Sequence, residues 1–348
     1  MKRLIFLAGV LSLCVTAWGS TTGVNYGRGP NYDARFWRYP AGAGMRWMDQ
    51  VENLLAMNIR LGKGKIFYVD SAVTASGDGS NWANAKKTPE EAVALCTANR
   101  GDVILMAQGH NEAVGTSADQ VDLDKAGITV IGLGGGSLKP TFDYDGAVAG
   151  TFTIGAANVT IVNLRFRCSV SDVNEAIEVE AAGDYFTCLH CDFGHAETAT
   201  DEFKSAITFQ AGADYGDVED CYFNSGLQAA VAAIEFSGAC VGARVTNNVV
   251  YGDYSTADIY GLTTLSEYLT ITDNILWNGG TNDIGGKPCI QLLTGTSATI
   301  ARNLCVCNLT TMAAAIVCDK AMLFENYYNE DMSSAGTGGL IGTASAND

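Results

Sequence analysis

The sequence predicts an all-β fold, a single-stranded parallel β-helix of about nine rungs, from three observations. From residue 159 onward a six-residue pattern recurs, in which an apolar residue is followed three positions later by Asn, Cys or Leu and two further on by another apolar residue. A second short apolar segment falls between successive copies, and Gly, Ala, Asn and Asp separate the two. Each period therefore holds at least two short strands and little room for a helix. Seven clear and two weaker copies begin at Ile161, Cys188, Val218, Val245, Ile271, Ile300 and Leu323, and at Val103 and Val130.

The clear copies are spaced 23 to 30 residues apart, a period shared by two kinds of solenoid. A leucine-rich repeat needs a Leu-x-x-Leu-x-Leu framework and often one helix per repeat, and neither occurs between residues 150 and 330. A parallel β-helix needs only short strands, tight turns and small residues. The pattern therefore favours the β-helix.

The first 19 residues are predicted to be a secretory signal peptide. Lys2 and Arg3 form a basic start, residues 4–15 are largely apolar, and Ala17-Trp18-Gly19 is a small-x-small cleavage site. The apolar run is too short to span a bilayer comfortably. We therefore expect a secreted protein, extracellular or periplasmic, without membrane contact once the signal is removed.

Residues 20–65 are predicted to form an N-terminal arm and a capping helix, since apolar residues recur at mostly helical spacing over residues 47–61. A second short helix is predicted to begin with Thr88 as its N-cap. Pro89 and Glu91 occupy the positions that a capping box and a helix start favour. Solenoid ends expose apolar rungs, so we expect these helices to cover the first rung.

Residues 66–330 are predicted to be the β-helix domain, with an asparagine ladder at one corner. Asn tolerates the left-handed backbone of a tight turn, and stacked side-chain amides can hydrogen-bond along the column. The sixth position of each copy is apolar and is predicted to be a core column. The fourth position reads Leu164, Cys191, Cys221, Asn248, Asn274, Asn303 and Asn326 in successive copies.

Residues 331–348 are mostly Gly, Ser, Ala and Thr with little apolar surface, and are predicted to be a flexible tail. Such a tail cannot cover the last rung as a folded cap. A homo-oligomer contact or a swung loop would then cover it.

The opening of the predicted domain resembles that of right-handed β-helix proteins of the pectate-lyase-like superfamily, which have the pectin lyase fold. The resemblance covers about residues 66 to 330. It implies the fold but no single activity, since the superfamily holds lyases, hydrolases, adhesins and phage tailspikes. The segments that carry it are Phe67-Tyr68-Val69-Asp70, Gly77-Asp78-Gly79-Ser80-Asn81-Trp82, Thr88-Pro89-Glu90-Glu91-Ala92, Gly101-Asp102-Val103-Ile104-Leu105 and Gly109-His110-Asn111-Glu112.

The catalytic motifs that the resemblance implies are missing. Its lyases commonly use calcium-binding carboxylates with an Arg or Lys base, and its hydrolases use an Asp trio and Gly-His-Gly, for which the nearest match is Gly194-His195-Ala196. From the residues alone, the best catalytic candidates are His190 and Asp220, at the third position of adjacent copies. A carboxylate beside an imidazole favours its charged form and can tune an acid or base. The alternative, which we favour, is an exposed polar ladder.

Acidic residues cluster over two or three rungs, and oxygen-rich surfaces of this kind can bind calcium. The loops typical of calcium sites are absent, so we predict a solvated acidic face, no metal site and no cofactor, with calcium as the alternative. The cluster contains Glu175, Glu178, Glu180, Glu197, Asp201, Glu202, Asp214, Asp217 and Glu219.

Composition restricts the partners. The chain of 348 residues has a net charge of −17, which repels nucleic acid and anionic lipid. Of its eleven cysteines, ten follow the signal peptide, and we expect buried thiols. The resulting hypothesis is an exported, non-catalytic β-helix, a structural, surface or virion-like appendage protein that binds glycans along a sheet face. The alternative is an enzyme, a polysaccharide lyase or glycoside hydrolase acting on acidic polysaccharide with a diverged site.

Overall fold

The structure is a computed structural model that describes residues 64–115, 121–146, 151–195, 201–261, 263–279, 287–307, 314–329 and 339–341. The predicted signal peptide, the helix over residues 47–61 and all but the last two residues of the 20–65 segment lie outside the described residues.

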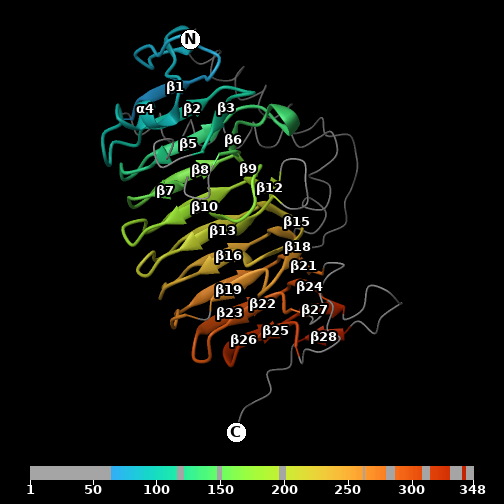
Figure 1. Cartoon of the computed structure of the whole chain (residues 1–348). Coiled ribbons are helices and arrows are strands. Elements are labelled where there is room, and N and C mark those ends of the chain that lie inside the picture. Colours follow the sequence, from blue (N-terminus) through green and yellow to red (C-terminus); the bar gives the residue numbers. More distant parts are fainter. Residues whose placement is uncertain are drawn as a thin grey trace, which may run out of the picture. The chain divides into compact units, whose positions relative to one another are not determined.

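The described residues form a parallel β-helix of three sheets, which confirms the predicted fold class (Figure 1). Sheet A stacks ten strands, which are β1 (Ile66–Val69), β2 (Val103–Met106), β5 (Thr129–Gly132), β8 (Thr160–Val162), β11 (Thr187–Leu189), β14 (Asp217–Glu219), β17 (Arg244–Thr246), β20 (Leu269–Thr272), β23 (Ser297–Ala301) and β26 (Lys320–Phe324).

Sheet B also stacks ten strands in the described residues, and each of the first nine follows a strand of sheet A along the chain. They are β3 (Asn111–Ala113), β6 (Thr141–Tyr144), β9 (Arg165–Cys168), β12 (Asp192–His195), β15 (Tyr222–Ala230), β18 (Val249–Tyr254), β21 (Ile275–Asn278), β24 (Leu304–Cys307), β27 (Asn326–Asn329) and β28 (Gly339–Ile341).

Sheet C completes each rung, and eight of its strands are described. They are β4 (Val121–Asp122), β7 (Phe152–Ile154), β10 (Val173–Val179), β13 (Phe203–Phe209), β16 (Ala232–Phe236), β19 (Ile259–Gly261), β22 (Ile290–Leu292) and β25 (Ile316–Val317).

The repeat pattern sets the register of the stack. The first position of every clear copy lies in sheet A and pairs with the first position of the next, as Ile161 does with Cys188 and Cys188 with Val218. Parallel strands stacked in register place equivalent side chains above one another. A shift of the strand register by one residue would turn the apolar side chains outward, so the repeat pattern specifies the register and the fold.

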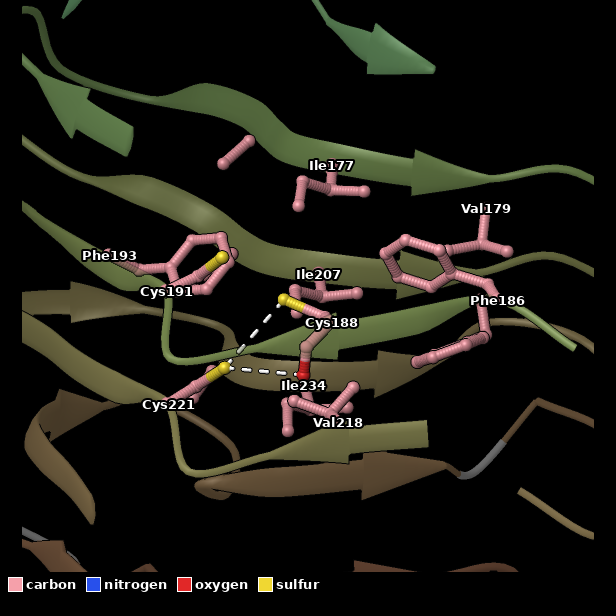
Figure 2. Packing of buried hydrophobic residues seen from close by; sticks show 14 of the residues in the cluster. Ile177, Val179, Phe186, Cys188, Cys191, Phe193, Ile207, Val218, Cys221 and Ile234 are labelled. Atoms are coloured by element: carbon pink, nitrogen blue, oxygen red, sulfur yellow. Dashed lines mark hydrogen bonds between the residues drawn. The ribbon is translucent and has the colours of Figure 1, made fainter. Parts of the chain in front are cut away.

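The sixth position forms the predicted apolar column inside the helix. The rings of Phe166, Phe193 and Phe223 are buried and nearly parallel, with centroids 5.0 and 4.7 Å apart. Figure 2 shows Phe193 beside the cysteines and the branched side chains of sheets A and C that fill the same interior. Burial of these side chains is the main stabilising term of the column.

The turn from sheet A to sheet B differs from the prediction in one respect. The left-handed residue is the third position of each copy and not the asparagine at the fourth, as in His190 (φ 54°), Asp220 (φ 56°) and Arg302 (φ 54°). The third residue turns the chain from sheet A to sheet B, and its side chain lies on the outside of the column. The fourth side chain then points into the column, and Asn248, Asn274, Asn303 and Asn326 are at most 1 % exposed.

These four asparagines form a continuous chain of hydrogen bonds. The Nδ2 of Asn248, Asn274 and Asn303 donates to the Oδ1 of the next asparagine at 3.1, 2.9 and 2.9 Å. Each Nδ2 also donates to a carbonyl of sheet A in the preceding rung, as Asn274 does to Val245 at 2.9 Å. The same Oδ1 atoms accept backbone N–H groups, so the buried amides are satisfied.

The N-terminal helix begins where the sequence predicts. Helix α4 spans Pro89–Val93, and the Thr88 side chain accepts a hydrogen bond from the Glu91 N–H at 3.3 Å. Its buried face, formed by Pro89, Ala92 and Val93, packs beside the first strands of the column. Like the predicted cap, α4 covers apolar side chains of the first rungs.

The ten cysteines from Cys96 to Cys318 are free thiols, as predicted, and all except Cys318 are buried. The Sγ atoms of Cys188 and Cys221 are 3.7 Å apart, in contact without a covalent bond (Figure 2). Burial raises the pKa of both thiols well above the usual value. They act as small apolar side chains of the core.

Three residues of the predicted tail form a strand. Gly339–Ile341 form β28, which pairs antiparallel with β27 through Asn326, Tyr327 and Tyr328. Leu340 and Ile341 are apolar residues within the Gly- and Ser-rich segment, and Ile has a high strand propensity. The other strand pairs of the three sheets are parallel in the described residues.

Candidate functional site

The predicted pair, His190 and Asp220, lies on the outer side of the A to B turns. The His190 Nδ1 and the Asp220 Oδ2 are 3.9 Å apart, too far for a hydrogen bond, and both side chains are mostly covered. In the same row, two guanidinium nitrogens of Arg302 donate to the carboxylate of Asp273 at 2.9 and 2.7 Å. This geometry fits a polar ladder more closely than a catalytic pair, since Asp273, two rungs after Asp220 in the same row, forms an ion pair with Arg302.

A more extensive polar surface lies on the outer face of sheet C. The side chains at one outward position of its strands are in register from rung to rung, over about 34 Å at the usual strand spacing. We call this set the C row. It consists of Asp122, Thr153, Glu178, Thr208, Glu235, Tyr260, Gln291 and Val317.

Neighbouring polar groups orient the carboxylates of the C row. Gln210 donates from Nε2 to the Glu178 Oε1 at 2.9 Å, and the Ser205 hydroxyl donates to the Glu235 Oε2 at 2.5 Å. Glu175 lies beside Ser205 on the same face. Burial, and then the charges of Glu178 and Glu235, raise the pKa of Glu175 to about 7. This face therefore presents hydrogen-bonding groups that are already fixed in position.

A small cavity opens at the corner between sheets B and C. Its volume is about 10 Å³, room for about one water molecule. Among the described residues, the Nδ1 of His195 and the Oε2 of Glu202 are buried without a hydrogen-bond partner, and both residues line the cavity. Asp201, Asn224, Ser225 and Tyr254 complete its polar wall, above an aromatic floor of Phe193, Phe203 and Phe223.

Glu202 has the properties of an acid at this corner. Burial, followed by the charges of Asp172 and Asp253, raises its pKa to about 7, so a large fraction of the carboxyl is protonated near neutral pH. A carboxyl whose pKa lies near the working pH can donate a proton. The sequence placed Glu202 only in a general acidic cluster, because its burial depends on three rungs meeting at one corner.

Metal binding and membrane spanning have no support in the described part of the chain. There, no group of three or more His, Cys, Asp or Glu side chains is arranged to hold a metal ion. Nor is any helix of these ranges long and apolar enough to cross a bilayer.

Comparison with known proteins identifies the fold. No family model matches the chain, and no curated protein matches it by sequence. Among solved structures it is similar to the pectate lyase Pel9A, with 14% identity, TM-score 0.56, and coverage of 78% of this chain and 72% of that one. It is also similar to a rhamnogalacturonan lyase, with 12% identity, TM-score 0.53, and coverage of 70% and 68%. At such low identity the likeness shows the fold alone. The chain thus has the parallel β-helix fold of pectate lyases that its opening segments suggested.

Proposed function

We propose that the protein is an exported, non-catalytic β-helix that binds an uncharged glycan along the outer face of sheet C. The observation that carries this proposal is the C row, in which the side chains of eight adjacent strands lie in register and seven of the eight are polar. Carboxylate, amide and hydroxyl groups are the partners that sugar hydroxyls need, and a rigid sheet holds them without further ordering. An extended polymer can follow such a row from rung to rung.

The charge of this face favours a neutral polymer over an acidic one. Glu175, Glu178 and Glu235 lie close enough to raise the pKa of one of them, so an added uronate would meet carboxylates. The charge of Lys204 acts in the opposite direction on the pKa of Glu175, and the Lys204 Nζ donates to the Asn174 side chain at 3.3 Å. The net charge of −17 adds a long-range repulsion of the same sign.

Affinity electrophoresis of the purified protein from Ser20 onward tests this function. The gels would contain dextran, xylan, mannan or, as the acidic polymer, polygalacturonate. We expect a neutral polymer to retard the protein, and the double variant Tyr260→Ala/Gln291→Ala to bind at least fivefold more weakly. Thr299→Ala, an outward residue of sheet A, is the matched control and should bind like the wild type. Equal binding by the double variant would refute the C row as the site.

A second candidate function, glycoside hydrolysis, is favoured by Glu202. Its raised pKa and its Oε2, which has no hydrogen-bond partner in the described part of the chain, fit a general acid that protonates a glycosidic oxygen. A lyase has less support, since it must neutralise a uronate on this acidic surface. Release of reducing ends from the same polymers, abolished in Glu202→Gln, would establish hydrolysis. Parallel reactions with calcium and with EDTA would test the predicted independence from metal.

A further inference from the structure

Tyrosines occupy a backbone position that other rungs give to Asn or Gly. At the turn from sheet C to sheet A, one or two residues before the sheet A strand, successive rungs carry a residue with positive φ. Its N–H donates to the carbonyl of the residue just before the equivalent position in the next rung. These hydrogen bonds show which positions of successive rungs correspond. The aligned positions are Gly127 (φ 72°), Asn158 (φ 59°), Tyr185 (φ 58°), Tyr215 (φ 58°), Gly242 (φ 70°) and Tyr268 (φ 56°).

The backbone does not require tyrosine at this position. Asn and Gly adopt the left-handed region readily, whereas a bulky residue there is uncommon and strained. Asn158 shows that the same turn forms with a residue suited to it. Strain retained at three of the six aligned positions points to a role for the side chains.

The tyrosine rings are exposed and arranged along the column. Tyr185 and Tyr215 are 51% and 47% exposed, and their rings stack with centroids 4.9 Å apart at 10°. Tyr268 is 70% exposed. A Cβ on Gly242 would lie 2.6 Å from the Tyr215 ring, so this glycine makes room for the ring over the next rung. We call these three residues the tyrosine stripe.

Carboxylates stand beside the rings. Asp184 and Asp214 each precede a stripe tyrosine, and Glu267 precedes Tyr268. The Oδ1 of Asp184 accepts the Asp214 N–H at 3.0 Å, and the Oδ1 of Asp214 accepts the Val241 N–H at 2.8 Å. These bonds fix the turns that present the rings. An exposed aromatic surface edged by fixed carboxylates suits a sugar, which has apolar C–H faces and hydroxyl edges.

We propose that the tyrosine stripe is a glycan-contact site, at which the rings of Tyr185, Tyr215 and Tyr268 pack against sugar rings. It lies where the strands of sheet C end, since Gln210, which bonds to Glu178 of the C row, precedes Tyr215 by five residues. The proposal rests on the proposed function in taking a glycan as the ligand, but it names a separate surface.

The test uses variants that remove the rings and suit the backbone. Tyr185→Asn/Tyr215→Asn places the residue of Asn158 in both rungs. In the electrophoresis with neutral polymers, we expect about tenfold weaker binding, while the melting temperature stays within a few degrees of the wild type. Gly242→Ala, which displaces the Tyr215 ring, should also weaken binding. Tyr327→Ala removes a tyrosine that is 54% exposed on sheet B, and this matched control should bind like the wild type.

The outcomes separate this proposal from the C row. Weaker binding by the stripe variants, in which the C-row residues are unchanged, supports the tyrosine stripe as a contact site. Wild-type binding by the stripe variants, with or without a lower melting temperature, overturns it and leaves the C row to be judged by its own variants. If only the stripe variants lose binding, the proposed site on sheet C fails and the stripe stands. Absence of binding by the wild-type protein to every polymer overturns both.

Discussion

The corner between sheets A and B is built in two chemically different halves. In the rungs nearer the N-terminus the inward position holds Leu164, Cys191 and Cys221, and in the rungs nearer the C-terminus it holds four asparagines. Both halves are buried to the same extent. The same turn can therefore be closed by apolar packing or by a fully paired polar network.

Cys221 lies at the junction of the two halves. Its Sγ is 3.6 Å from the Cys188 carbonyl, which is the carbonyl equivalent to those that the asparagine Nδ2 atoms bind. Its own N–H donates to the Asn248 Oδ1 at 2.9 Å. The thiol therefore occupies the place of an amide but supplies only a weak donor. The loss of stability on substitution should therefore differ between the two halves, because removal of a thiol leaves a void and removal of an amide leaves unpaired polar groups.

The largest effect is expected from Asn274→Ala. The substitution removes the acceptor of the Asn248 N–H and Nδ2 and the donors to Val245 and Asn303. Several buried groups then lack partners, so we expect the free energy of unfolding to fall by about 3–5 kcal/mol. Urea denaturation followed by circular dichroism measures it. A loss below about 1 kcal/mol would mean that the ladder does not stabilise the corner.

A smaller loss is expected from Cys221→Ala in the other half. Removal of one buried sulfur leaves a small void and no strongly polar group unpaired, at a cost of about 1–2 kcal/mol. The same denaturation experiment gives the value. If this variant lost as much stability as Asn274→Ala, the expected difference between the two halves of the corner would be wrong.

Two carboxyl groups, Glu175 and Glu202, should make the stability depend on pH. They should not change the difference in stability between the two corner variants. The folded pKa values of Glu175 and Glu202 are raised to about 7, so the folded state binds more protons than the unfolded state between about pH 4.5 and 7. Their effect is absent below that range, and stability falls as pH rises through it. Allowing for solvent screening, we expect a loss of about 1 kcal/mol from each group.

Denaturation of Glu175→Gln and Glu202→Gln at pH 5 and pH 8 checks this dependence. In each variant, the free energy of unfolding should fall less between pH 5 and pH 8 than it does in the wild type. The two corner variants involve neutral groups, so the difference between them should be the same at both pH values. A difference that changed with pH would show that the two halves of the corner are not independent of the carboxyl groups.

The smallest effect is expected from Cys221→Asn, which would extend the ladder by one rung. The new Nδ2 could donate to the Cys188 carbonyl and to the Asn248 Oδ1, as the other asparagines do in their rungs. We expect unchanged or slightly higher stability, by up to about 1 kcal/mol. A clear loss of stability would show that Cys188 and Cys191 leave no room for the amide.

The sequence predicted the features that repeat and missed those that depend on meeting rungs. The period, the core column at Phe193 and the N-cap at Thr88 follow from local pattern. The left-handed residue was placed one position late, since Asn is a frequent left-handed residue and its inward direction is visible only once the turn is built. Glu202 and Tyr215 each belong to a surface made by three rungs, and a single rung contains no signal for it.

Strand β28 has a consequence for how the column ends. Because it runs antiparallel to β27, it cannot continue the stack in the sense of the other strands of sheet B. Sheet A ends in β26 and sheet C in β25, which are the last strands of those sheets in the described residues. Copies stacked head to tail would meet strands of the parallel repeat on sheets A and C but a reversed strand on sheet B, so a segment of three residues interrupts the parallel repeat at this end of the column.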